Sequence, residues 1–232
     1  MMDGAGWDKF HGDYKKLSKK LSTMNLEFTV HPPAWDINLT AEMEDLRKVA
    51  FQIHQDTLKF SADIGAAHMV FHPGFSGSPC FSKKTAQARA HEAVCSLAEI
   101  ANKCGVKLAF ENVGYHGQSI YTEEEYSHAL DQVDPIVGYL IDTGHANVNH
   151  WDIKSLIVKV SSRLIGYHIH DNNGKSDQHL PMGMGTIGWD EIYKAMIKVH
   201  SVDFDYVLEY APGTDFKSYE EGKNLLGHIL NN

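Results

Sequence analysis

The stretch 167–179 concentrates side chains that could hold a metal ion: His168, His170, Asp177 and His179. Residues 165–170 form an apolar run that predicts a buried strand, and Asp-Asn-Asn-Gly at 171–174 predicts a turn after it. Alternate side chains of a strand face the same side, so His168 and His170 are expected to share a face. Imidazole and carboxylate groups in one segment suit a divalent cation. The simpler alternative is a polar loop with solvated histidines.

Six apolar runs of the chain end at or beside such a side chain: His31, His72, Glu111, Asp142, His170 and Glu209. The runs are continuous rather than alternating, which predicts a parallel sheet covered by helices. A single His or carboxylate in this position is more often an ordinary residue at a strand end. Burying Glu111 and Glu209 without a partner would however cost several kcal/mol each, so a bound cation is the natural partner.

The segments between these runs show helical periodicity or capping signals, which predict helices over about 14–22, 40–64, 84–104, 151–161 and 189–200. Capping-box patterns at Thr122–Glu125 and Ser218–Glu221 predict the start of two further helices. Strand and helix therefore alternate six times. Because no linker interrupts this order, a single TIM-barrel-like domain is expected over residues 1–232.

The six candidate side chains at the strand ends indicate whether the sheet is open or closed into a barrel. An open parallel sheet gathers its ligands at one switch point, whereas a (β/α)₈ barrel gathers them at the carboxyl ends of all its strands. We therefore predict an α/β fold of the (β/α)₈ TIM-barrel type. Only six βα units are found, so the chain is expected to lack the first two strands and to hold the last six of eight.

Composition narrows the classes of function. The 232 residues carry a net charge of −9 and contain three arginines, which disfavours a surface that follows nucleic-acid phosphates. The longest apolar runs are too short to span a bilayer, and the first residues do not have the pattern of a signal peptide. The three cysteines form no paired framework. We therefore expect a cytoplasmic protein in a reducing compartment, with no membrane partner and a nucleic-acid partner unlikely by composition.

The motifs FHPG, FEN, IDTGHA, HIHDN, DQHLPMGMGTIGW and LEY lie between about Leu26 and Pro212. In combination they resemble the xylose-isomerase-like TIM-barrel superfamily of sugar (phosphate) isomerases and epimerases, which also contains zinc-dependent apurinic/apyrimidinic endonucleases of the endonuclease IV type. The isomerase branch implies one divalent metal, Zn²⁺ or Mn²⁺, held by Glu111, Asp142, His170 and Glu209. It also implies that Glu111 and Glu209 form an acid/base pair that moves a proton next to a carbonyl.

The same resemblance implies residues for the substrate. His145 would contact a sugar hydroxyl, Lys175 is the one well-placed cation for a phosphate, and Trp35 is a candidate for an apolar floor under a sugar ring. Phe75, Tyr115 and Trp151 are further candidates for that floor, and ordinary loop packing explains each of them equally well. The glycine-rich segment Gly183–Gly188 could hold a phosphate through its N–H groups, although a tight loop before the following helix is favoured.

The endonuclease branch implies three zinc ions and nine ligands, and every ligand type has a counterpart here: His31, His72, Glu111, Asp142, His145, His170, Asp177, His179 and Glu209. The expected number of metal ions is therefore one to three. Acidic loops after the strands, Ala34 where that branch carries an aromatic residue, and the short chain favour the isomerase branch. We expect a metal-dependent enzyme acting on a small carbohydrate, with the endonuclease as the alternative; a homo-oligomer is possible.

Overall fold

The computed structural model describes residues 14–34, 36–78, 80–114, 118–199, 201 and 204–230. The chain packs as two compact units. The first unit contains the chain up to Glu111 together with 129–138, and the second contains 112–128 together with the chain from Tyr139 onward. Two of the predicted aromatic substrate contacts, Trp35 and Tyr115, lie outside the described residues.

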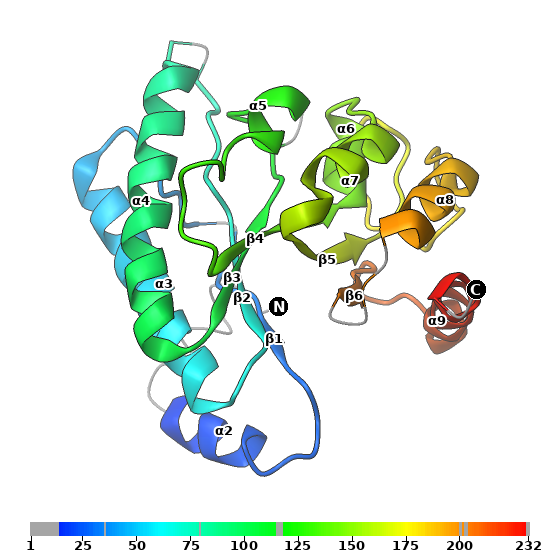
Figure 1. Ribbon diagram of the computed structural model, residues 1–232, viewed down its shortest axis with the longest axis horizontal. Coiled ribbons are helices and arrows are strands. Elements are labelled where there is room, and N and C mark those ends of the chain that lie inside the picture. The colour runs from blue at the N-terminus through cyan, green and yellow to red at the C-terminus, as the bar shows by residue number, and fades with distance from the viewer. Residues whose placement is uncertain are drawn as a thin grey trace. The chain divides into compact units, whose positions relative to one another are not determined.

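The first unit holds three parallel strands in chain order: β1 (Thr29–Val30), β2 (His68–Phe71) and β3 (Lys107–Glu111). Thr29 pairs with His68, and His68 pairs with Lys107. The helices of this unit are α2 (Tyr14–Leu21), α3 (Glu44–Asp63) and α4 (Lys83–Cys104). Helices α3 and α4 lie side by side (Figure 1). Gly105 ends α4 with a φ of 69°, a left-handed conformation that glycine adopts without steric cost.

The second unit is built on β4 (Val137–Asp142), whose first residues still belong to the first unit, β5 (Leu164–Ile169) and β6 (Asp205–Leu208). These strands also pair in parallel and in chain order, with Asp142 opposite His168 and Ile169 opposite Leu208. The remaining elements are α5 (Glu123–Ser127), α6 (Thr143–Val148), α7 (Ile153–Val160), the 3₁₀ turn Ser161–Arg163, α8 (Trp189–Val199) and α9 (Phe216–Leu230).

The predicted α/β class with six parallel strands is confirmed for the described residues. Each of the six side chains predicted at the strand ends belongs to the last residue of its strand or to the residue that follows it. The capping box at Thr122 and Glu125 is confirmed in full. The box predicted at Ser218 is wrong, because α9 begins earlier and Asp215 accepts the hydrogen bond from the Ser218 N–H (2.8 Å). Helix α6 was not predicted: Thr-Gly-His-Ala has weak helical propensity, and the Asp142 carboxylate caps it.

Candidate metal centres and active site

The first candidate centre lies at the carboxyl ends of the strands of the first unit and consists of His31, His72 and Glu111. Adjacent parallel strands bring these three side chains together. The Nε2 atoms of His31 and His72 are 3.1 Å apart. A carboxylate oxygen of Glu111, a residue that is 1 % exposed, lies 2.9 Å from Nε2 of His72 and 3.6 Å from Nε2 of His31.

The hydrogen bonds of this centre suit a cation. Nδ1 of His31 donates to the carbonyl of Pro32 (2.6 Å), so its Nε2 presents a lone pair toward His72 and Glu111. Metal-bound histidines almost always have this arrangement, because the second nitrogen fixes the tautomer. Ligands of a tetrahedral Zn²⁺ lie about 3.3 Å apart. The spacings in the first centre match that value.

The second candidate centre lies within the second unit and consists of His145, His170, Asp177 and His179. Its members come from the first turn of α6, from the residue after β5, and from the loop 171–188. The rings of His170 and His179 stack with centroids 3.9 Å apart. Nδ1 of His145 donates to the carbonyl of Asn112 (2.9 Å), and Nδ1 of His179 donates to the carbonyl of Glu209 (2.6 Å). Two imidazoles therefore again present Nε2 to a shared carboxylate.

Asp177 is the shared carboxylate of the second centre. Its Oδ2 lies 2.8 Å from Nε2 of His179 and 3.7 Å from Nε2 of His145. Its Oδ1 is buried and has no hydrogen-bond partner among the described residues. Burial alone would raise the pKa of Asp177, but the imidazoles of His145 and His179 hold it well below its usual range. A buried, ionised oxygen with no hydrogen bond is the position where a cation would compensate the charge.

His179 has an unusual backbone conformation. Its φ is 49°, one of two positive values found at non-glycine residues of the described chain. Strain of this kind persists where surrounding contacts impose it. Here the His179 carbonyl accepts from the N–H of Ala211 (2.8 Å), and the ring bonds to Glu209 and Asp177. Burial would lower the pKa of His179, but the hydrogen bond and charge of Asp177 raise it to about 9.

The loop that carries Asp177 and His179 is held by one buried carboxylate, that of Asp171. It accepts four hydrogen bonds, from the N–H groups of Asn172, Gly183 and Ile187 and from the indole of Trp189, at 2.8, 3.1, 3.2 and 2.9 Å. The Asp171 backbone also exchanges two hydrogen bonds with Leu180, the residue after His179. Gly185 has no room for a side chain, because a Cβ would lie 2.2 Å from Asp171. Two N–H groups of the segment Gly183–Gly188 thus bind the protein's own carboxylate, which favours the tight-loop interpretation over a phosphate site.

The strand ends of the second unit bring Asp142, His168 and Glu209 into a third arrangement. Nδ1 of His168 lies 3.3 Å from Glu209 Oε2. The side chains of Asp142 and His168 are 0 % and 4 % exposed, whereas that of Glu209 is 16 % exposed. Glu209 is therefore the member of this set that solvent or a substrate can reach.

The structure separates the two strand-end histidines that the sequence placed on one face. His168 faces Glu209, whereas the Nε2 atom of His170 lies 3.0 Å from Asp142 and 3.7 Å from Asp177. The reason is that β5 ends at Ile169, so His170 has left the strand and packs against Gly144 of α6. The stretch 167–179 pointed to His168 as a possible ligand, but the two ligand sets that the family resemblance implies contain His170 and not His168.

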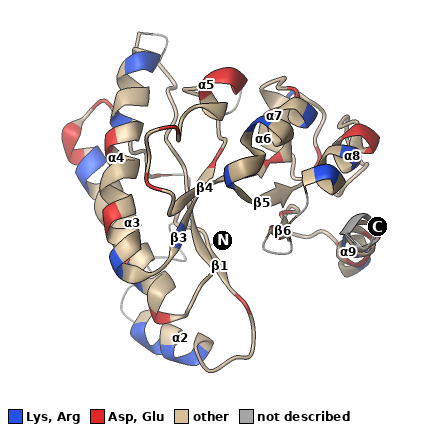
Figure 2. Cartoon of the chain, viewed as in Figure 1, with Lys and Arg blue, Asp and Glu red and all other residues tan. Residues whose placement is uncertain are grey.

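The predicted substrate contacts are placed as follows. Lys175 is exposed at the tip of the loop, and its backbone N–H bonds to Asn173 (2.9 Å). Trp151 packs against Tyr126 with ring centroids 5.5 Å apart, which is the contact of a packed side chain. Part of the acidic sequence expected in the loops lies on a helix: α5, in the segment between β3 and β4, carries three consecutive glutamates (Figure 2). No helix in the described ranges is both long and apolar enough to cross a membrane.

The fold and these clusters place the chain among α/β proteins that carry candidate metal ligands at the carboxyl ends of parallel strands. Residues 3–226 match the family model described as xylose isomerase-like TIM barrel, and the chain belongs to that family. An uncharacterised protein of Methanocaldococcus jannaschii, MJ1614, is 28% identical over 77% of this chain and 69% of its own length.

Several relatives carry functional names, of two kinds. A D-psicose 3-epimerase of Ruminiclostridium cellulolyticum is 30% identical over 73% of this chain and 58% of its own length. A probable endonuclease 4 of Mycoplasmoides gallisepticum is 27% identical over 74% of this chain and 60% of its own length. The chain thus spans less than two thirds of both.

Solved structures show the same fold. A D-tagatose 3-epimerase-like protein superposes with a TM-score of 0.80 at 23% identity, covering 95% of this chain and 83% of the other. The IOLI protein, solved with a zinc atom bound, superposes with a TM-score of 0.78 at 18% identity, covering 97% and 84%.

Proposed function

We propose that the protein is a divalent-metal-dependent isomerase or epimerase of a small carbohydrate. The observation that carries this proposal is the Glu209 carboxylate, which is accessible at the end of β6 while its neighbours His168 and Asp142 are buried. An accessible carboxylate beside buried ligand groups can exchange a proton with a substrate. The sugar-epimerase names among the relatives and the acidic loops support a neutral carbohydrate as substrate.

In this proposal Glu111 and Glu209 transfer the proton next to the substrate carbonyl. They also serve as ligands together with Asp142 and His168, which takes the place that the sequence assigned to His170. When bound, the metal, Zn²⁺ or Mn²⁺, polarises the substrate oxygens. His145, Lys175 and Trp35 remain the proposed substrate contacts.

Deuterium exchange tests the proposal whichever product the enzyme forms. The metal-loaded protein is incubated in D₂O with a panel of ketoses and ketose phosphates, and NMR detects deuterium at the carbon next to the carbonyl. Glu209→Gln and Glu111→Gln should abolish exchange, whereas Lys198→Gln, which removes an exposed charge from α8, should not. Exchange that persists in both glutamine variants would refute the acid/base assignment.

A second function, zinc-dependent phosphodiester hydrolysis, is favoured by one specific observation. Each unit contains its own cluster of candidate ligands, whereas a mononuclear epimerase needs neither His31 and His72 nor Asp177 and His179. Several zinc ions together can activate a hydroxide and clamp a phosphodiester. An endonuclease 4 name among the relatives is in line with this.

Metal content separates the two functions. The protein is purified without chelator or added metal, and its metal ions are counted by elemental analysis. About one equivalent would favour the epimerase, and about three zinc ions per chain would favour the phosphodiesterase. In the latter case an oligonucleotide with an abasic site is the next substrate, and its cleavage without any ketose exchange would reverse our ranking.

A further inference from the structure

A groove on the outer surface of the first unit contains two of the three arginines of the chain. It lies between α3 and α4, which run side by side, and has a volume of about 540 Å³. Leu39, Phe51 and Ala93 give it an apolar floor, and Arg47 and Arg89 line it together with Lys48. The candidate metal centres use none of these residues.

The two guanidinium groups are close neighbours. Nη1 of Arg47 and Nη1 of Arg89 donate to the same acceptor, the carbonyl oxygen of Ala41, at 2.7 and 3.0 Å. Each Nη1 makes one more bond to a backbone carbonyl, that of Glu42 for Arg47 and that of Thr40 for Arg89. Two permanent positive charges that share one neutral acceptor repel each other.

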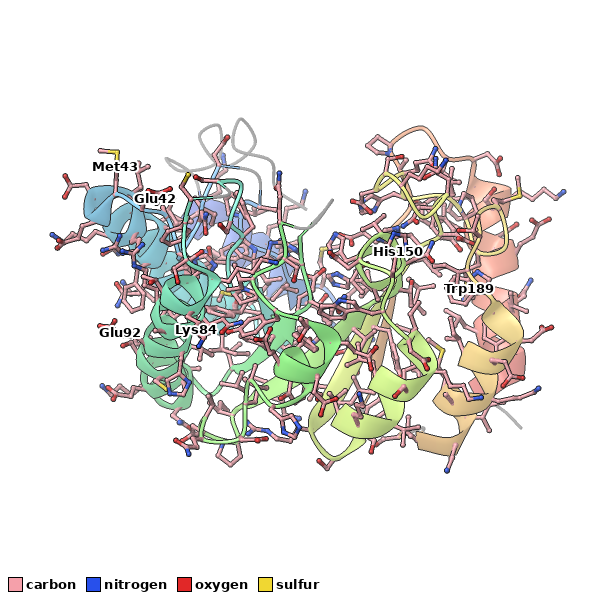
Figure 3. The ribbon with its side chains drawn as sticks, turned by 90° about the horizontal axis from the view of Figure 1, so that it is seen from above. Glu42, Met43, Lys84, Glu92, His150 and Trp189 are labelled. Atoms are coloured by element: carbon pink, nitrogen blue, oxygen red, sulfur yellow. The ribbon has the colours of Figure 1, made fainter. Side chains whose placement is uncertain are left out.

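The surroundings offset the charge of this pair only in part: the Phe81 ring lies 5.2 Å from Cζ of Arg89, and the charge of Arg47 adds to that of Lys48 in lowering the pKa of Glu44. Neither guanidinium forms an ion pair with a described carboxylate. Glu44, which lines the groove, pairs instead with Lys48 at 2.7 Å. Glu92 also lines it and projects outward from α4 (Figure 3). The Nε and Nη2 groups of both arginines therefore keep donors for a ligand, and a carboxylate or phosphate with two oxygens to offer is the group that fits such forks.

We propose that this groove binds a small molecule with a carboxylate or phosphate group on a compact apolar body. The oxyanion would bridge Arg47 and Arg89, and the apolar body would contact Phe51 and Ala93. The volume is that of a site for a molecule of drug size. The ligand would also brace residues 40–42, to which both arginines already bond.

NMR titration of the metal-loaded, ¹⁵N-labelled protein tests this proposal, because amide shifts place the ligand. The probes are phenyl phosphate, benzoate and, as the neutral control, benzyl alcohol. We expect saturable shifts at residues 39–42 and 89–96 with an oxyanion probe and none with the alcohol. The oxyanion with the higher affinity assigns the head group. Shifts confined to the metal centres, or no saturation at about 10 mM of either oxyanion, would overturn the proposal.

Four variants locate the site. Arg47→Gln or Arg89→Gln should weaken binding at least about tenfold. Because these changes also remove bonds to residues 40–42, two variants that keep both arginines are decisive. Ala93→Phe should fill the groove and abolish binding, and Glu92→Gln should tighten it about threefold by removing a like charge from the ligand's surroundings. Unchanged affinity in both would overturn the assignment to the groove, and Lys198→Gln on α8 is the matched charge control.

Discussion

The first and second candidate centres, here called the first and second clusters, each lie within one unit but are built by different means. His31, His72 and Glu111 each end or follow a separate strand, so the register of the sheet alone brings them together. In the second cluster, His145 lies on a short helix, and Asp177 and His179 lie on a loop. A loop does not fix two side chains by itself. The second cluster therefore depends on the hydrogen bonds that hold the loop in place.

The two clusters therefore differ in how many residues outside the ligand set determine their geometry. We expect the first cluster to tolerate change outside its three strands, because the register of those strands places its ligands. The second cluster rests on groups that never touch a metal, above all Asp171 and Gly144. Variants of those two residues should affect the second cluster and leave the first intact.

Asp171→Asn should have the largest effect. The amide NH₂ of asparagine would face two N–H donors, whichever way it is turned, and the charge that holds the four bonds would be lost. We expect the loop to lose about 4 kcal/mol of local stability. Trypsin should then cut at Lys175, which is exposed but lies in an ordered loop in the native chain.

A milder change in the same network provides the control. Trp189, labelled in Figure 3, begins α8 and contributes one of the four donors. Trp189→Phe removes only that donor, so cleavage at Lys175 should increase far less. Equal cleavage rates in the two variants would contradict the role assigned to Asp171.

Gly144→Ala should have the second largest effect. A Cβ at this position would lie 1.9 Å from Cε1 of His170, so the ring would have to leave Asp142 and Asp177. We expect a cost of about 2–3 kcal/mol. Where the purified protein holds a metal ion at the second cluster, that ion alone should be lost, as measured by competition with a chelator dye. Gly188→Ala is the matched control, because nothing lies within 4 Å of its Cβ position and its φ is not in the glycine range. Metal loss of equal size in both variants would refute the explanation.

The sequence predicts the first cluster better than the second for the same physical reason. Continuous apolar runs define the strands, and a residue at the end of a parallel strand has its position set by the fold. His31, His72 and Glu111 could therefore be located by counting. The position of His170 could not be located in this way, because it depends on where β5 ends. The strand ends at Ile169, one residue earlier than predicted, and the His170 ring therefore lies beside Asp142 and not beside Glu209.

The support of the second cluster was also hidden in the sequence. From the sequence, Asp171 is expected to be a turn residue, and Gly183–Gly188 is expected to form a tight loop before the following helix. Their relation rests on hydrogen bonds between residues up to eighteen positions apart, which no periodicity encodes. Likewise, the start of α9 was missed because Asp215 and Ser218 are both good capping residues and only packing decides between them.

The next largest effect is expected in the first unit, where the free energy of unfolding should depend on pH through His54. His54 on α3 is buried, and burial lowers its pKa to about 4, although its Nδ1 donates to the carbonyl of Ala50 (2.8 Å). In the unfolded chain this histidine takes up its proton near pH 6.5. Protonation therefore favours the unfolded state: the contribution to stability is complete above about pH 6.5 and is lost as the pH falls toward 4.

Denaturant unfolding at pH 7 and pH 5 measures this contribution. Wild-type protein should lose about 2 kcal/mol more than His54→Gln between these values, at roughly 1.4 kcal/mol per pH unit. The difference between the two proteins removes the contribution of groups that titrate in both. An equal loss in both would show that His54 is not the group responsible. Proteolysis at Lys175 should not follow this change, since that loop belongs to the second unit.

Lys175→Gln should have the smallest effect and separates the tip of the loop from its base. The Lys175 side chain is exposed, whereas the bonds to Asp171 lie at Gly183, Ile187 and Trp189. Metal content and loop stability should therefore stay unchanged. If Lys175 contacts a substrate phosphate, KM for a ketose phosphate should rise about threefold to tenfold, with kcat and the KM of the unphosphorylated sugar unaffected. Steady-state kinetics on the pair of substrates decides the matter, and an equal change on both would place Lys175 in the loop's structure rather than in substrate binding.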